Sequence, residues 1–457
     1  MAVQRLDHAP LHDFGTWVPL LRLLRRHGEG RNADTDWYAS GRIGAAEWSL
    51  RLEDPAAAYE SGAAGPVCEA VAAAGVEGVT FSVRFTPSGP ATLRVMGLER
   101  PDAPSPGMLL LVEGAVPEPW RRLPDPAPDA VPAPTADPEL LARTIKERMP
   151  AAEGASDVQI ADAEARLGVP LPDELKALYR VADLKLHSDS DAGRREALRY
   201  EEAVRWEPYP LASCHIADAT TRPAPWDHAA LEAVGADPDA RVQGLVGSPG
   251  WIVFGENGGG DRLAVDLTPG PRGHVGQIIL IGHEEYVGAE LLADSLTDLL
   301  FGRGREEERR EPEARRAAVA HVNIHATPSV EAAAHPGLEV LSIGVLDGEP
   351  VSLAPAVGLP RLRTLSASPG TLADPCEIAR LTGLEFLSLG PREWRVLLDA
   401  DAVPRGLSAA AIDTHGLPET TPVPVALANE ILALWHRPPI VRTLLKGDLG
   451  PADRHHG

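Results

Sequence analysis

The sequence has few of the residues from which covalent and metal cross-links are built. It holds three cysteines in 457 residues, Cys68, Cys214 and Cys376, and they lie far apart. An odd number of cysteines at such spacing forms neither a disulfide framework nor a C-x-x-C metal site. We therefore expect no structural disulfide, and a reducing, cytoplasmic location.

Long apolar runs are also missing. No run of about 18 apolar residues occurs, and the first residues lack a basic segment followed by an apolar one. The sequence thus predicts neither a membrane span nor a secretory leader. Lysine is scarce as well, with four among the 43 basic residues, and we draw no mechanism from that bias.

Positive charge is in deficit. Acidic residues outnumber basic ones by 66 to 43, which gives a net charge of -23. Such a chain repels phosphate backbones and anionic membranes, so nucleic-acid and membrane partners are disfavoured and a basic protein partner is favoured. The apolar fraction of 44% is that of an ordinary folded protein.

Two shifts in composition divide the chain. At about 150 residues per domain the length suggests about three domains. Prolines crowd residues 124–138, which predicts a semi-rigid linker, and mixed charges fill 303–316, which predicts a solvated connector. We expect an N-terminal α+β module at 1–123, a middle domain at 139–302, a third part at 317–415 and a helix with a tail at 416–457.

The first segment predicts one helix and a hairpin. Trp17, Leu20, Leu21 and Leu24 fall on one helical face. Apolar residues alternate over 79–85 and again after a T-P-S-G-P turn, and a further strand can begin at Gly107. We identify no family for this segment.

The middle segment predicts an α+β domain with an antiparallel sheet. Ser156 and Gln159 form a capping box for a helix that ends at Gly168, and a second apolar helical stripe follows Pro172. Strands are expected over 251–254, 263–267 and 274–282, and a helix closes the domain near residue 300.

In sequence and order these elements resemble the SUKH superfamily, which contains the yeast cell-wall-synthesis regulator and many bacterial immunity proteins. The resemblance covers about residues 156–302. It rests on Glu164, Leu167, Gly168, Leu171, Pro172, Leu175, Tyr179, Trp251, Gly260, Asp261, Asp266, Gly273 and Val275.

The resemblance implies a binding domain without catalysis or cofactor; bacterial members typically neutralise a toxin, often a nuclease. Residues 156–302 hold 25 acidic and 12 basic residues, hence a local net charge of -13, which suits a basic partner. We expect a toxin-binding immunity protein. The alternative is a cytoplasmic regulatory or scaffolding protein that holds separate partners, and an unrecognised hydrolase is the weakest interpretation.

A repeat marks the third segment. The spacing L-x-x-L-x-L recurs, with starts 19, 24, 22 and 23 residues apart, which is typical of leucine-rich repeats. This predicts a short solenoid with one parallel strand per repeat. The helix at the tail, with Leu427, Ile431, Leu434 and Trp435 on one face, is expected to cap it. The repeats begin at Val319, Leu338, Leu362, Leu384 and Leu407.

Several groups of polar residues resemble parts of catalytic or metal sites. The GENGGGD segment from Gly255 lacks the lysine of a phosphate loop and is better explained as a hairpin turn. Neither the histidine pairs 8/12 and 321/325 nor the adjacent residues 213–215 form a site at a usable spacing. Asp261, Asp266, His283, Glu284 and Glu285 could form a metal or acid/base site if the fold brought them together. We favour the simpler interpretation that the four acids are scattered over the surface.

Aromatic residues supply the remaining candidates. Trp206, Tyr209 and Trp226 lie in a polar, proline-interrupted stretch, where large aromatics are common interface anchors. Trp251, in an apolar strand, is expected in the core. The predicted partner-binding residues are therefore these three aromatics together with Asp261, Asp266, Glu284 and Glu285.

Overall fold

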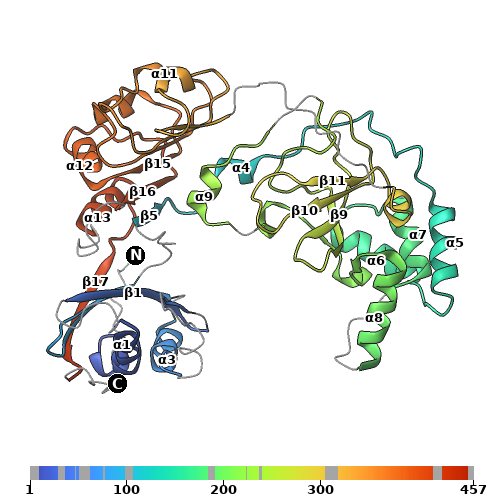
Figure 1. Ribbon diagram of the computed structural model, residues 1–457, viewed down its shortest axis with the longest axis horizontal. Coiled ribbons are helices and arrows are strands. Elements are labelled where there is room, and N and C mark those ends of the chain that lie inside the picture. Colours follow the sequence, from blue (N-terminus) through green and yellow to red (C-terminus); the bar gives the residue numbers. More distant parts are fainter. Residues whose placement is uncertain are drawn as a thin grey trace.

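The computed structural model describes residues 10–28, 36–46, 48–50, 62–75, 78–97, 107–183, 191–222, 224–235, 239–303, 318–414 and 425–450. Figure 1 shows three units in an arch, with the repeat-bearing unit between the N-terminal and the middle units.

The N-terminal unit is an antiparallel sheet with two helices on one face (Figure 1). The predicted hairpin is confirmed, and Phe81 and Val83 point from its first strand into a buried core. Trp17 of the first helix packs edge-on against Phe81, with ring centroids 5.3 Å apart. The elements are α1 (Phe14–Gly28), β1 (Trp37–Gly44), β2 (Trp48–Leu50), α3 (Gly65–Ala74), β3 (Gly78–Phe85) and β4 (Pro90–Gly97).

The remaining strand of this sheet comes from the other end of the sequence. Strand β17 (Val441–Asp448) pairs antiparallel with β4, giving the order β17-β4-β3-β1-β2. A side chain at Gly447 would place its Cβ 2.2 Å from the ring of Phe14, so the close approach of α1 requires glycine. The sequence suggested a module at 1–123 and a separate tail, whereas the tail strand β17 completes the sheet of that module. Pairing between segments so far apart leaves no local sequence pattern.

In the middle unit the predicted helices are present. The capping box is confirmed: the Ser156 hydroxyl accepts from the Gln159 amide, and the Gln159 side chain accepts from the Ser156 amide at 2.9 Å. Gly168 ends that helix with a φ of 74°. The helices are α5 (Pro138–Arg148), α6 (Asp157–Leu167), α7 (Asp173–Val181), α8 (Asp191–Val204), α9 (Trp226–Ala230) and α10 (Leu296–Leu300).

The middle sheet is antiparallel and buried on both faces, in the order β11-β10-β9-β8-β6, with β7 also paired to β8. Ile252 and Phe254 face the helices, whereas Trp251 and Val253 face a second cluster formed with residues 209–245. Trp251 has no exposed surface, so the prediction that it belongs to the core is confirmed. The strands are β6 (Glu207–Pro208), β7 (His215–Ile216), β8 (Trp251–Glu256), β9 (Arg262–Asp266), β10 (Gln277–Ile281) and β11 (Glu290–Ala293).

A buried carboxylate joins three helices of this unit. Glu174, in the first turn of α7, accepts from the backbone amides of Leu296 at 2.9 Å and Thr297 at 3.0 Å, at the start of α10. It also accepts from the amide of Asp137 at 3.2 Å, immediately before α5. The end of the proline-rich segment is thereby fixed to the middle unit.

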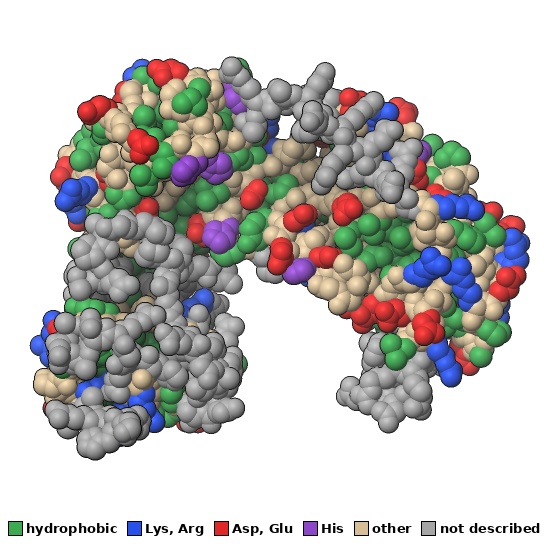
Figure 2. All heavy atoms as spheres, in the orientation of Figure 1, with side chains coloured by type: hydrophobic (Ala, Val, Ile, Leu, Met, Phe, Trp, Pro, Cys, Tyr) green, Lys and Arg blue, Asp and Glu red, His purple; other side chains and the backbone are tan. Residues whose placement is uncertain are grey.

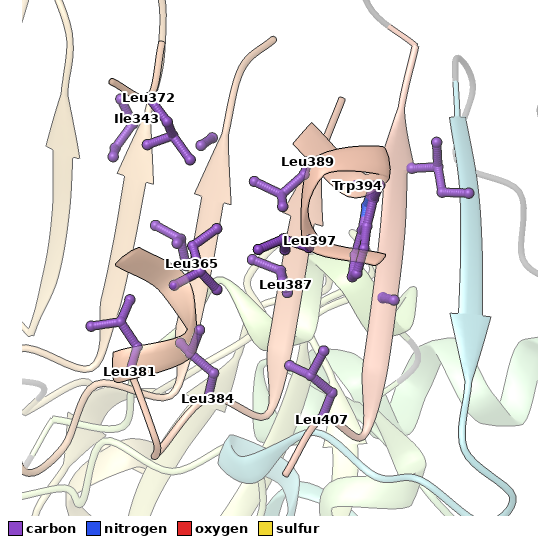
Figure 3. Packing of buried hydrophobic residues seen from close by; sticks show 14 of the residues in the cluster. Ile343, Leu365, Leu372, Leu381, Leu384, Leu387, Leu389, Trp394, Leu397 and Leu407 are labelled. Carbon is purple, nitrogen blue, oxygen red and sulfur yellow. The ribbon is translucent and has the colours of Figure 1, made fainter. Parts of the chain in front are cut away.

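The third unit contains a parallel sheet whose strands follow the repeat. Leu341, Leu365, Leu387 and Ala410 occupy one continuous row. Figure 3 shows the leucines of this core stacked between the strands and the returning segments. The expected strands are therefore present, while their assignment to the leucine-rich-repeat class stays a prediction. They are β12 (Val319–Val322), β13 (Val340–Ile343), β14 (Thr364–Ala367), β15 (Phe386–Leu389) and β16 (Ala409–Asp413).

Both ends of the sequence contribute to this repeat unit. Strand β5 (Gly107–Leu111), predicted within the first module, instead pairs antiparallel with β16. Helix α13 (Val425–Leu434) buries Leu427 and Ile431 in the repeat core, as a cap would, whereas Leu434 is 47% exposed. The other helices are α4 (Glu118–Arg121), which precedes the middle unit, and α11 (Val330–Ala333) and α12 (Pro391–Asp399) in the repeats.

Substitution of the buried carboxylate tests its linking role. Glu174→Ala leaves backbone amides of α10 without acceptors, so we expect a loss of about 3 kcal/mol in the free energy of unfolding, measured by chemical denaturation of the full chain. Asp162→Ala, on the exposed face of α6, is the matched control and should change it by less than about 0.5 kcal/mol. Equal effects of the two substitutions would contradict the role.

Candidate partner-binding surfaces

Of the aromatic candidates, Trp206 and Tyr209 support the middle sheet. Trp206 is 4% exposed and packs edge-on against Phe254, with ring centroids 5.7 Å apart. Tyr209 is partly buried, and its hydroxyl donates to Glu256 at 3.1 Å. Trp206 thus lies in the core rather than free for a partner, because the irregular stretch that contains it folds back over the sheet.

The third aromatic, Trp226, is an anchor within the chain. It is 8% exposed, lies edge-on to Phe386 of β15 at 5.3 Å, and donates from its indole nitrogen to the carbonyl of Ala115 at 3.2 Å. Helix α9 of the middle unit is thereby seated on the repeat sheet. The residue does serve an interface, but the surface it contacts belongs to the same protein.

Beside α9, a buried ion cluster holds the middle unit to the repeats. Glu339, 1% exposed, pairs with Arg122 at 2.9 Å and with Arg363 at 3.4 Å. Arg363 also donates to the carbonyl of Ala230 in α9 at 2.9 Å. Burial lowers the pKa of the Arg363 guanidinium, and the carboxylates of Glu339 and Glu118 oppose that shift.

The residues of this ion cluster recur with the period of the repeats, so no single short motif reveals them. Glu339, Arg363 and Glu385 each follow the first leucine of a repeat, so their charges alternate in a column at the strand starts. The α4 segment complements the column: Glu118 lies 3.6 Å from Arg363, and Arg121 lies 2.7 Å from Glu385. A repeat alignment that included polar positions would have exposed it.

On the face of the repeat sheet that α9 partly covers, one row of side chains remains accessible. Ser342, Ser366 and Ser388 occupy a single row across β13, β14 and β15, opposite the buried leucines, and His321 of β12 begins that row. The serines are half-buried and the histidine is exposed. Figure 2 shows acidic and histidine side chains on the surface around the junction between this unit and the middle unit.

The glycine-rich segment is confirmed as a hairpin between β8 and β9. Gly258 and Gly260 have φ values of 74° and 96°, which side-chain-bearing residues rarely adopt. The Asn257 side chain accepts from the amides of Gly259 at 2.8 Å and Asp261 at 3.1 Å. Those amides are therefore engaged within the turn rather than in a phosphate cradle.

The structure brings together only part of the predicted acidic group. Asp261 lies 2.8 Å from the His283 ring, and this hydrogen bond lowers the pKa of Asp261 and raises that of His283. The side chain of Glu284 is 88% exposed, and Glu285 is exposed as well. Within the described ranges no cluster of histidine, cysteine and acidic side chains could hold a metal ion.

Asp266 stands apart from that group. Asp266 is fully buried, and its carboxylate accepts hydrogen bonds from the Trp251 indole at 3.1 Å and from the side-chain amide of Gln277 at 2.9 Å. It therefore cannot contact a partner. Burial raises its pKa to about 6. The expectation that Asp266 is a surface acid that binds a partner is wrong, because Asp266 ends β9 inside the sheet, whereas Asp261 precedes the start of that strand.

Comparison with known proteins identifies the middle unit. Residues 154–302 match the model of the SMI1 / KNR4 family (SUKH-1). The middle of the chain is an SMI1/KNR4 (SUKH-1) domain. The predicted resemblance is therefore confirmed. No helix among those the structure describes is long and apolar enough to cross a membrane.

Several curated proteins that match this chain come from fungi. The chain is 41% identical over 93 residues to a glucan synthesis regulatory protein of Neurospora crassa, covering 19% of this chain and 18% of that one. It is 36% identical over 78 residues to the cell wall biosynthesis/cell cycle regulator smi1 of Schizosaccharomyces pombe, covering 16% of each. A KNR4/SMI1 homolog 2 of Debaryomyces hansenii is 38% identical over 65 residues, 14% of this chain and 11% of that one. The matches thus span less than a fifth of those relatives.

Glu339→Gln tests the ion cluster. It leaves the guanidinium of Arg363 buried without its main counter-charge, so we expect a loss of about 3 kcal/mol in the free energy of unfolding. Chemical denaturation followed by Trp fluorescence measures it. Asp399→Asn, which removes one partner of an exposed pair with Arg395, is the control and should cost less than about 1 kcal/mol. A loss no larger than the control's would exclude a stabilising cluster.

Asp266→Asn tests the buried carboxylate through pH. The pKa of Asp266 is about 6 in the folded chain against an ordinary value of 3.8, so the folded state binds the proton more tightly. Relative to the variant, the wild type should therefore gain about 2 kcal/mol of unfolding free energy as the pH falls from about 7 to about 4. Denaturation of both proteins across that range gives the difference, and a difference that is constant or shrinks would refute the expectation.

Proposed function

We propose that this chain is a non-catalytic regulatory or scaffolding protein of the cytoplasm, which holds separate protein partners on its SMI1/KNR4 domain and on its leucine-rich-repeat-like sheet. The match of residues 154–302 to a family with relatives named as regulators carries this proposal. It needs no cofactor and no metal.

Two accessible surfaces suit such a role. On the SMI1/KNR4 domain, Asp261, Glu284 and Glu285 form an acidic rim beside the hairpin, which favours a basic protein partner. On the repeats, Ser342 and Ser366 belong to the serine row of β13, β14 and β15, whose hydroxyls suit a polar partner. Because Trp226 and the ion cluster join the two units, partners on these surfaces would be held in a fixed relation.

The immunity interpretation has the acidity of residues 156–302 in its favour. A toxin that cleaves nucleic acid carries a basic active site, and an acidic inhibitor would associate with it quickly. Two of the relatives compared above are named as regulators. The regulatory interpretation is therefore the one we propose.

Surface substitutions in the full chain test it. Glu284→Lys with Glu285→Lys alters the acidic rim, and Ser342→Arg with Ser366→Arg alters the repeat row, without touching either core. We expect each pair to abolish capture of a different protein, measured by cross-linking and mass spectrometry of complexes purified from the native host.

Glu139→Lys with Asp162→Lys, exposed on α5 and α6, is the control for the change in net charge and should retain both partners. If both test pairs lose the same protein, the two surfaces form a single composite binding site and the chain is not a scaffold for separate partners. Retention of every partner by the test pairs would exclude these surfaces.

A further inference from the structure

The N-terminal sheet has a second face, of which one end, at Met96, is buried against the repeat unit and its helix α13. Helices α1 and α3 pack on the side of Phe81 and Leu93 (Figure 1). Strand register places the alternate residues on the opposite side, which we call the outer face. It includes Tyr38, Ser40 and Arg42 of β1, Thr80, Ser82 and Arg84 of β3, Pro90, Thr92, Arg94 and Met96 of β4, and Arg442, Leu444, Lys446 and Asp448 of β17.

Charge on the outer face is opposite to that of the chain. Five basic residues, Arg42, Arg84, Arg94, Arg442 and Lys446, and one acidic residue, Asp448, occupy these positions, although acidic residues outnumber basic ones by 66 to 43 overall. Arg84 and Lys446 flank Thr92 in one row, and Arg94 lies in the next row. Like charges on neighbouring strands repel one another, and an anion bound between them would reduce that repulsion.

Among the described residues, few acidic groups lie near Arg84, Arg94 and Lys446. The Nε atom of Arg84 lies 3.8 Å from a carboxylate oxygen of Asp36 at the margin of the face, and both side chains are 43% exposed. This Nε atom is itself buried and has no hydrogen-bond partner among the described residues. Within the described part of the chain, no carboxylate forms an ion pair with Arg94 or Lys446. Lys446 is exposed and Arg94 is half-buried.

We infer that the outer face binds an acidic, extended segment of a partner protein. The row from β3 to β17 crosses two strand spacings, about 10 Å, which a few extended residues span. Carboxylates would pair with Arg84, Arg94 and Lys446. The hydroxyls of Ser82 and Thr92 lie between these cations and can donate hydrogen bonds to the same carboxylates.

Charge and shape favour a short acidic peptide over nucleic acid. Tyr38 is the one aromatic side chain on the outer face, so bases would find no stacking platform. A longer polyanion would also extend beyond the patch by more than the screening length of about 8 Å and meet a chain of net charge -23. The surface is distinct from the acidic rim and the serine row, so the inference does not depend on the proposed function.

Fluorescence anisotropy on the full chain tests it, with a labelled peptide of about ten glutamates as the probe. The variant is Arg94→Glu with Lys446→Glu. We expect it to bind the peptide at least tenfold more weakly, an effect of about 1.4 kcal/mol or more. Binding by the wild type should fall between about 50 and about 300 mM salt, because the contacts are ionic.

Arg380→Glu with Arg405→Glu, at exposed positions of the repeats, makes the same change in net charge and should leave peptide binding unchanged. Arg94→Gln with Lys446→Gln, a milder variant, should lose a smaller part of the affinity and keeps the test valid if charge reversal prevents folding. Equal weakening by the repeat variant would show that net charge alone acts, and would overturn the inference.

Two other outcomes would also overturn it. A thymidine oligonucleotide of equal charge that binds more tightly than the peptide would make nucleic acid the occupant. Self-association seen by analytical ultracentrifugation, and lost in the Arg94→Glu and Lys446→Glu variant, would make a second copy the occupant through its acidic middle domain.

Discussion

The arrangement of the molecule depends on the burial of one carboxylate between two units. Glu339 begins a repeat strand, and desolvating its charge would cost several kcal/mol without compensation. Arg122 and Arg363 supply that compensation from the linker side and from the neighbouring repeat. Because the cations come from different segments, the cluster forms only when α4, α9 and the repeat sheet meet. Trp226 then completes the joint by filling the apolar space over Phe386.

The joint alters what a partner can reach. It covers the starts of the repeat strands and buries Trp226, while the serine row and the hairpin with Asp261 remain accessible. The middle domain and the repeats therefore present their surfaces from one assembly. Charge is distributed unevenly over that assembly, since the middle domain holds more than half of the acidic excess and the outer face of the N-terminal sheet is basic.

Local patterns predicted much of the secondary structure. Capping at Ser156, the stop at Gly168 and the alternation around Phe81 depend on neighbouring residues, and each is present as expected. The repeat spacing likewise placed the parallel strands. The candidate site was predicted less well: Asp261 and His283 do meet, but Trp206 and Asp266 are buried. Exposure depends on which segments fold over a residue, and a linear pattern does not contain that information.

By itself, the sequence determined the helix ends, the strand alternation, the repeat period and the SMI1/KNR4 elements, because these depend on contacts between nearby residues or on fixed spacings. The tertiary structure alone decided that β17 completes the N-terminal sheet, that β5 joins the repeat sheet, and that α4 complements the charge column. Such pairings join segments far apart in the chain. Their stability comes from burial and charge compensation, which exist only once those segments have been brought together.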